Sequence, residues 1–295
     1  MMVEFQNKWD FTLDAESYHA RKEFLSSGAL RALLRSPRHY HQRYIVGAKE
    51  KPSAAKSLGS LIHAAILEPE RFSQNLKLAP KFDKRTKAGK EAWSEFQEKF
   101  GPEAILCEQS EYEAILGVLE AVNHHPVAKD ILIGGDRECS GFFKLENGIF
   151  GKIRPDLILR DRGIILDVKT CADARRRAAE SSIWKYRYDI QASWYLMGSR
   201  ILEPSTKWDM YGFLFVEKEP PYSCAIYMAD PVMLEIGDRD IKTGLNIYKN
   251  CLKEGKWPGY QKEPEMISVP DYARIDFEQA YDGLEEEYPY EQPRN

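Results

Sequence analysis

Two aspartates and a lysine lie within two neighbouring apolar stretches near the middle of the chain. Asp156 follows Pro155, whereas Asp167 and Lys169 stand on either side of Val168. Because side chains alternate along a strand, Asp167 and Lys169 point to the same face. Charges on a buried strand are costly unless they are paired or hold a metal ion. These residue types at this spacing therefore indicate a metal-dependent hydrolytic site.

Residues 149–170 are expected to form a β-hairpin that brings these charges together. The two strands are separated by residues 161–163, where Gly163 can supply the positive φ that a tight turn needs. The first strand would carry Asp156 and the second Asp167. The fold-back therefore places the carboxylate of Asp156 beside the other two charged side chains.

A helix made almost entirely of apolar residues is expected over residues 58–68. Ser60 is its expected cap, and Pro69 is expected to end it. A helix that is hydrophobic all round is buried. His63 is its one titratable group before Glu68. Taken alone, such a histidine is more typical of a hydrogen-bonded core residue than of a metal ligand.

Basic residues gather in three segments that suit contacts with a phosphate backbone. A solvated protein surface explains each segment equally well. The segments contain Arg35, Arg38, His39, His41 and Arg43; Lys77, Lys81, Lys84, Arg85, Lys87 and Lys90; and Arg175, Arg176 and Arg177.

The order of the remaining elements predicts an α/β fold with a mixed sheet and an N-terminal helical elaboration. A helix over 188–197 places Gln191 and Tyr195 on one face. Further helices are expected at 90–100, 108–125 and 232–252, and further strands at 136–145, 210–216 and 224–228.

Length and composition are those of an ordinary globular protein with one integrated domain. The chain has 295 residues, 43% hydrophobic and 30% charged, with a formal net charge of −4. We expect a helical part at 1–130 that contributes to the active site, a core at 131–260, and an acidic, proline-containing tail at 261–295.

No apolar run is long enough for a membrane span, and the N-terminus lacks the layout of a secretory signal. The five cysteines are widely spaced and include no C-x-x-C pair. We therefore expect free thiols in a reducing compartment and a cytoplasmic location.

Three short motifs together resemble a known nuclease signature. Pro155-Asp156, then Asp167-Val168-Lys169, then Gln191 and Tyr195 are similar to the PD-(D/E)xK motif with the Q-x-x-x-Y extension of its RecB-like branch. Within that branch, the sequence most resembles exodeoxyribonuclease VIII (RecE-type) nuclease domains of phages and prophages. The resemblance spans roughly residues 25–200 and includes segments 26–40, 59–72 and 80–90. The acidic position is aspartate rather than glutamate, which the signature permits.

The resemblance implies a PD-(D/E)xK restriction-endonuclease-like core, with a central mixed β-sheet flanked by helices. It also implies a role for each candidate residue. The catalytic residues would be Asp156, Asp167, Lys169, Gln191 and Tyr195. The metal ligands would be His63, Asp156, Asp167, the main-chain carbonyl of Val168 and Glu138, although Glu138 is equally well explained as a surface glutamate. The DNA-binding residues would be Lys84, Arg85, Lys87, Arg175, Arg176 and Arg177.

By this resemblance we expect a Mg²⁺-dependent exodeoxyribonuclease, with Mn²⁺ able to substitute. It would degrade double-stranded DNA ends processively from 5′ to 3′, leaving 3′ overhangs for phage-type recombination. A single-strand annealing protein would be a partner, and the chain would form a ring-shaped homo-oligomer by analogy. Two alternatives stay open: an endonuclease or nickase on the same core, and a non-catalytic DNA-binding module. Whether Lys169 acts as a base or stabilises negative charge also stays open.

Overall fold

The computed structural model describes residues 5–47, 54–83, 85–101, 104–269 and 274–275. Residues up to Pro258 belong to one compact unit, and those from Gly259 onward belong to a second. Most of the acidic tail expected at 261–295 lies outside the described residues. All the elements discussed below belong to the first unit.

A five-stranded mixed sheet forms the centre of the first unit. Its neighbouring strands β8 (Ile164–Cys171) and β9 (Met210–Glu217) run parallel in a strand–helix–strand crossover, and the other pairs are antiparallel. The predicted mixed sheet is therefore confirmed. In spatial order the strands are β10 (Cys224–Met228), β9 (Met210–Glu217), β8 (Ile164–Cys171), β7 (Leu157–Leu159) and β4 (Asp136–Arg137).

The first strand of the predicted hairpin is in fact two strands in two sheets. β6 (Phe150–Ile153) pairs with β5 (Ser140–Lys144), which pairs with β1 (Lys8–Asp10) in a separate three-stranded sheet. Asp156 lies in the link before β7 and not within a strand. Pro155 has no backbone N–H to donate to a ladder, which explains the interruption here. The turn after β7 is the short 3₁₀ helix η2 (Arg160–Arg162), closed by Gly163 at φ 64°.

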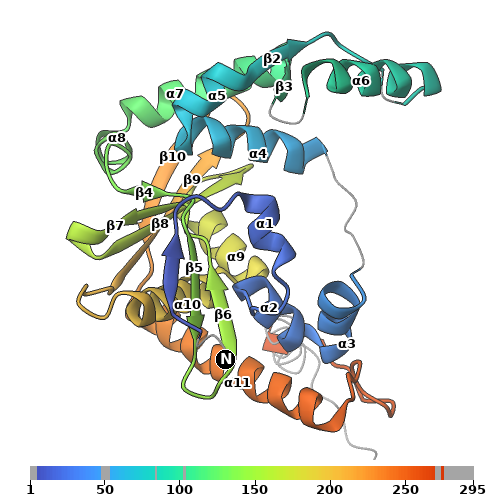
Figure 1. Cartoon of the computed structure of the whole chain (residues 1–295), viewed down its shortest axis with the longest axis vertical. Coiled ribbons are helices and arrows are strands. Elements are labelled where there is room, and N and C mark those ends of the chain that lie inside the picture. The colour runs from blue at the N-terminus through green and yellow to red at the C-terminus, as the bar shows by residue number, and fades with distance from the viewer. Residues whose placement is uncertain (1–4, 48–53, 84, 102–103, 270–273, 276–295) are drawn as a thin grey trace, which may run out of the picture. The chain divides into compact units, whose positions relative to one another are not determined.

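Helices cover both faces of the central sheet (Figure 1). One face packs on α10 (Tyr188–Leu202), α11 (Pro231–Glu254) and α2 (Ser27–Arg35). The opposite face packs on α4 (Ala54–Leu67), α7 (Gln109–His124) and α8 (Pro126–Ile131). Ile165 faces α10, whereas Leu166 and Val168 face α4 and α7. Alternation therefore sends Asp167 and Lys169 to the α10 face of the sheet.

A buried lysine forms hydrogen bonds that hold the N-terminal helix α1 (Ala15–Ala20) against the three-stranded sheet. Lys152 of β6 donates hydrogen bonds of 2.7 Å to the main-chain carbonyls of Tyr18 and Arg21. Its ammonium group also lies 4.6 Å from the centre of the Tyr18 ring. Burial lowers the pKa of Lys152 to about 8. These contacts hold α1 against the body of the protein.

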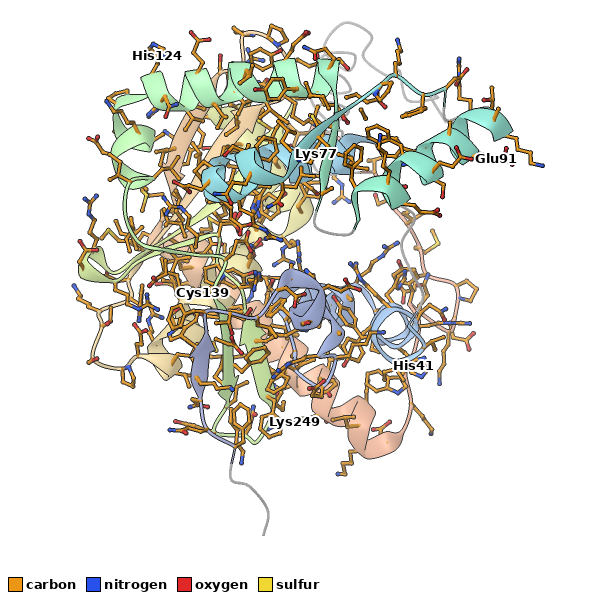
Figure 2. All side chains as sticks on the ribbon, turned by 45° about the horizontal axis from the view of Figure 1, so that its top comes forward. His41, Lys77, Glu91, His124, Cys139 and Lys249 are labelled. Atoms are coloured by element: carbon orange, nitrogen blue, oxygen red, sulfur yellow. The ribbon has the colours of Figure 1, made fainter. Side chains whose placement is uncertain are left out.

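The segment after α4 corrects two sequence predictions. α4 already begins at Ala54, so Ser60 is not its cap, and Pro69 starts the next helix, α5 (Pro69–Asn75). The expected basic loop at 77–90 contains most of the strand β2 (Leu76–Ala79) and the start of α6 (Lys87–Phe100). β2 pairs in parallel with β3 (Ile105–Glu108). α6 buries no side chain, and Glu91 projects outward from it (Figure 2).

The remaining helices are short or connect the layers. They are α3 (Pro37–Tyr40), the π-helix η1 (His41–Ile45) and α9 (Arg176–Tyr186). Within the ranges given above, no helix combines the length and apolar character that crossing a membrane would require.

Candidate active site

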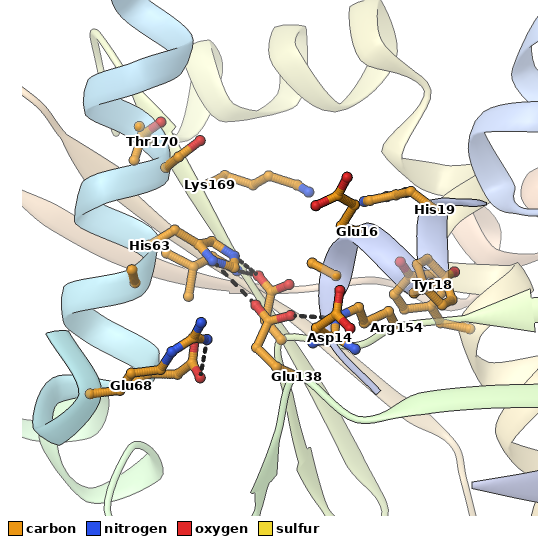
Figure 3. Close-up of a pocket in the computed structure, with 18 of the residues that line it drawn as sticks. Asp14, Glu16, Tyr18, His19, His63, Glu68, Glu138, Arg154, Lys169 and Thr170 are labelled. Atoms are coloured by element: carbon orange, nitrogen blue, oxygen red, sulfur yellow. Dashed lines mark hydrogen bonds and ion pairs between the residues drawn. The ribbon is translucent and has the colours of Figure 1, made fainter. Parts of the chain in front are cut away.

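A cavity of about 1140 Å³ opens beside the central sheet. Its walls come from α1, α4, α5, the end of β8, α10 and the segments that connect the strands. Figure 3 shows His63, Glu138 and Lys169 converging on this space, with Glu16 and His19 of α1 on the opposite side. Segments distant in sequence therefore share one polar cavity.

Three potential metal ligands meet on one side of the cavity. His63 Nε2 lies 2.8 Å from Asp156 Oδ2, and His63 Nδ1 lies 3.4 Å from Glu138 Oε1. One ligand atom from each residue falls within 4.8 Å of the other two. Two carboxylates and an imidazole are donors that divalent cations accept in proteins. The residues present therefore fit a divalent metal ion.

The electrostatics of these three residues favour positive charge at this point. Burial opposes protonation of His63, yet the neighbouring Asp156 and Glu138 raise its pKa to about 9. Burial also opposes ionisation of Asp156, but His63 and the N–H of Val168 lower the pKa of this carboxyl. Burial and the charge of Asp156 raise the pKa of Glu138. Two close carboxylates thus create the negative potential that a metal site requires.

The catalytic lysine predicted from the sequence belongs to a second cluster on the α10 face. Lys169 Nζ forms an ion pair with Asp167 and donates a 3.1 Å hydrogen bond to Gln191 Oε1. Gln191 Nε2 donates in turn to Asp167 Oδ1 at 2.5 Å. Lys169 Nζ also lies 4.3 Å from the centre of the Tyr188 ring. The lysine is therefore held from three sides and reaches the cavity with its ammonium end.

Burial and the nearby carboxylates shift the protonation of this second cluster. Burial and the charge of Asp156 raise the pKa of Asp167 to about 6. Burial alone would lower the pKa of Lys169, but its contact with Asp167 raises it. The side chain of Asp167 is 1% exposed and does not line the cavity. In this arrangement Asp167 holds the lysine, and its carboxylate also interacts electrostatically with Asp156 and His63.

Glu138 owes its position to an arginine and to an uncommon backbone conformation. It lies between β4 and β5 with φ 52°, a region that residues other than glycine seldom adopt. Arg154 Nε donates 2.8 Å to Glu138 Oε2, and its Nη1 donates to the Leu13 carbonyl and the Ser140 hydroxyl. Arg154 thus fixes one ligand candidate relative to the segment that precedes α1.

Comparison with known proteins now identifies the family. A family model described as "PDDEXK-like domain of unknown function (DUF3799)" matches residues 26–269. The chain belongs to this family. The match confirms the PD-(D/E)xK prediction made from the three motifs, and the mixed sheet with flanking helices confirms the predicted fold class.

Solved structures similar to this PDDEXK-like domain include two bacterial proteins. One, from Eubacterium rectale, is described as a "putative exonuclease"; the two are 14% identical, with a TM-score of 0.59, and 97% of each chain is covered. The second is described as a phage-related exonuclease from Haemophilus somnus 129PT, with 13% identity, a TM-score of 0.35, and 79% of this chain and 96% of that chain covered. The first likeness shows the fold. No curated protein matches the sequence.

The structure of this PDDEXK-like domain gathers some predicted residues and separates others. Asp156, His63, Glu138, Val168, Lys169 and Tyr195 line the cavity, and Asp167 and Gln191 lie directly behind Lys169. Of the predicted DNA-binding residues, those that the structure describes do not line it. Arg85 pairs with Asp83, Arg175 with Asp173 and Arg176 with Glu180. Lys87 Nζ lies 3.7 Å from Glu91 Oε1. Arg177 is exposed, and Lys84 lies outside the described residues.

Sequence reasoning missed Arg154, Tyr188 and the α1 residues of the cavity wall. Arg154 stands two residues before Asp156, so an arginine this close to the motif was the available signal. Tyr188 stands three residues before Gln191, almost one helical turn away. α1 carried no such signal, because its place depends on Lys152, more than a hundred residues away.

Proposed function

We propose that this PDDEXK-like domain is a metal-dependent deoxyribonuclease that hydrolyses phosphodiester bonds in the cavity. One observation carries the proposal: His63, Glu138 and Asp156 converge within 4.8 Å of one another on the same cavity that Lys169 enters. A phosphodiester is anionic, so its hydrolysis needs positive charge near the phosphate and an activated water. Both requirements can be met in this cavity.

His63, Glu138 and Asp156 would hold the metal ion, which we propose to be Mg²⁺ with Mn²⁺ able to substitute. The bound ion would supply charge neutralisation and a lower pKa for its water. Lys169 would add a fixed positive charge or hold the attacking water. Asp167 and Gln191 would keep its ammonium group aimed at the phosphate. Arg154 would keep Glu138 in place.

The finer proposal is an exonuclease that acts from 5′ to 3′ on double-stranded DNA ends and leaves 3′ overhangs for phage-type recombination. It rests on the RecE-type resemblance of the motifs, as do the annealing-protein partner, the ring-shaped homo-oligomer and the proposed backbone contacts of Lys84, Arg85, Lys87 and Arg175 to Arg177. The polarity, the partner and the oligomer concern the biological role of the domain, and they are proposed by analogy with that family.

The decisive experiment uses the full chain with Mg²⁺ and two DNA substrates. One is a linear duplex labelled at one 5′ end, and the other is a covalently closed circle. Release of label as mononucleotides from the linear DNA, with the circle intact, would support the 5′ exonuclease. A cut or nicked circle would replace it with the endonuclease. No cleavage of either DNA with Mg²⁺ or Mn²⁺ would refute the nuclease. EDTA and Lys169→Met are the controls for metal and site.

A further inference from the structure

An aromatic path leads from the protein surface to Lys169. Tyr186 ends α9 and Tyr188 begins α10, and their rings stack with centroids 5.6 Å apart and an interplanar angle of 30°. Tyr186 is 48% exposed, whereas Tyr188 lines the cavity. The Tyr188 ring lies 4.3 Å from Lys169 Nζ. The stacked rings of Tyr186 and Tyr188, called the aromatic step below, therefore extend from the exposed surface to Lys169.

This step depends on a break between two helices at Arg187. Arg187 adopts a left-handed conformation, with φ 55° and ψ 49°, which side-chain-bearing residues seldom adopt. Its guanidinium group donates to Asp189 and forms an ion pair with Asp240 of α11. The ion pairs hold this conformation in place. As a result, the two tyrosines on either side of Arg187 stack on each other.

Two basic side chains, Lys185 and Arg31, lie beside Tyr186, in addition to Arg187, whose charge is paired with Asp189 and Asp240. Lys185 Nζ lies 5.4 Å from the centre of the Tyr186 ring, and Arg31 Nη1 donates a 2.7 Å hydrogen bond to the Tyr186 carbonyl. Trp184 is 56% exposed, and the Arg187 guanidinium lies over its ring, 5.5 Å from the ring centre. Exposed aromatic faces among positive charges are the combination that binds single-stranded nucleic acid, through stacked bases and a neutralised backbone.

We infer that the exposed ring of Tyr186, supported from behind by Tyr188, binds an unpaired nucleobase of the strand whose phosphate lies at Lys169. The inference rests on the proposed nuclease function and specifies its substrate: the strand enters the cavity unpaired, as a single strand or the frayed end of a duplex. A base inside a duplex is stacked on both faces and offers no face to a tyrosine. Lys169, Tyr186 and Phe213 all lie against the Tyr188 ring, so Tyr188 spaces Tyr186 from the lysine. A phosphate beside Lys169 would therefore place its own base, or the base of the adjoining nucleotide, at Tyr186.

The first test measures base stacking directly and does not depend on cleavage. Single strands of about ten nucleotides, with 2-aminopurine at successive positions, are titrated with the full chain in Ca²⁺. We expect fluorescence quenching at one or two adjacent positions. Tyr186→Ala should weaken binding about tenfold and reduce the quenching, because stacking on an aromatic side chain contributes affinity of this order. Tyr186→Phe should behave as the wild type.

Phe11→Ala is the matched control, because Phe11 is an aromatic residue that is 60% exposed and does not line the cavity. It should leave binding and quenching unchanged. Equal quenching by the wild type and Tyr186→Ala, or no quenching by the wild type, would overturn the inference. Tyr186 is exposed, so its truncation leaves the packed core intact.

The second test pairs the variant with an altered substrate in Mg²⁺. Removing the base at the quenched position should slow wild-type cleavage about tenfold and add little to the loss in Tyr186→Ala, because both changes remove one contact. If the rate reductions caused by base removal and by Tyr186→Ala multiply, the inference is overturned and the proposed nuclease activity still stands. Quenching without any cleavage by the wild type would refute the nuclease and support base binding by the aromatic step.

Discussion

Lys169 and Lys152 occupy similar surroundings but make different contacts. Each is largely buried on a strand, and each has its ammonium group against a tyrosine ring, at 4.3 Å in Lys169 and 4.6 Å in Lys152. Lys169 is paired with a carboxylate and an amide side chain, and it enters the cavity. Lys152 donates to two main-chain carbonyls and does not line the cavity.

The difference shows that burial alone does not mark a functional lysine. The carboxylate of Asp167 outweighs the effect of burial and raises the pKa of Lys169. Burial lowers the pKa of Lys152 to about 8, because the opposing charge of Glu23 offsets the effect of burial only in part. Lys169 is thus a positive charge at the cavity, and Lys152 is a connection between α1 and the three-stranded sheet. The predictions below test this division.

The largest expected effect follows from Lys169→Met. It removes the charge while keeping a side chain against Tyr188, so DNA cleavage should fall by about 10²- to 10⁴-fold with DNA binding nearly unchanged. Single-turnover cleavage and equilibrium binding in Ca²⁺ measure the two quantities. The control is Lys207→Met, since Lys207 forms an exposed pair with Asp209. Cleavage at the wild-type rate would remove Lys169 from the reaction.

The next effect concerns the metal-ligand side of the cavity. Asp156→Asn removes a negative charge beside His63, so half-maximal activity should need at least about tenfold more Mg²⁺. A Mg²⁺ titration of the cleavage rate measures this change. Glu16→Gln is the comparison, because Glu16 lines the cavity outside the three-residue cluster. An equal shift in both variants would show that general charge, and not coordination, is responsible.

A smaller and local effect is expected at the second lysine. Lys152→Met removes the lysine donor from the Arg21 carbonyl and one of two donors from the Tyr18 carbonyl, which also accepts from the Arg21 N–H. We therefore expect α1 to open more readily. The amides of α1 should exchange about tenfold faster with solvent, since an unpaired buried acceptor costs about 1–3 kcal/mol. Hydrogen exchange read by mass spectrometry measures this opening. Lys144→Met, an exposed lysine on neighbouring β5, is the control; equal exchange in both variants would contradict the anchoring role.

The lysine cluster could be predicted from the sequence because it is local. Strand alternation places Asp167 and Lys169 on one face, and helical spacing places Gln191 and Tyr195 on one side of α10. The central sheet and its main helices followed from the same two periodicities. The exception was Asp156, expected within a strand and found in the link where the chain passes from one sheet to the other.

The other side of the cavity depends on contacts between distant segments. Judged from its helix alone, His63 was more typical of a core residue. Its contact with Asp156 joins residues 93 positions apart in the sequence. Glu138 needed both a positive φ and Arg154 to face the cavity. Neither periodicity nor composition encodes these contacts. The resemblance to a nuclease family drew attention to both residues, and the geometry showed that they meet Asp156.

The last prediction concerns the contribution of Lys152 to the pH dependence of stability. Its pKa is about 8 in the folded protein, below the ordinary lysine value of 10.5. Between these values the unfolded chain binds more protons, so raising the pH from 8 to 10.5 favours folding through this group. The melting temperature of the wild type should therefore rise relative to that of Lys152→Met across this window. Below pH 8 the difference should be constant.

The expected size of this rise is about 2–4 °C for each pKa unit realised, given roughly 1.4 kcal/mol per unit. Measuring the difference between the two proteins cancels the titrations that they share, which include those of His63, the tyrosines and the cysteines. Lys169 provides the contrast, because its raised pKa predicts no such rise in this window. A wild-type curve that runs parallel to that of Lys152→Met from pH 8 to 10.5 would show that the two carbonyls stabilise the ammonium form fully. The two lysines would then differ only in their access to the cavity.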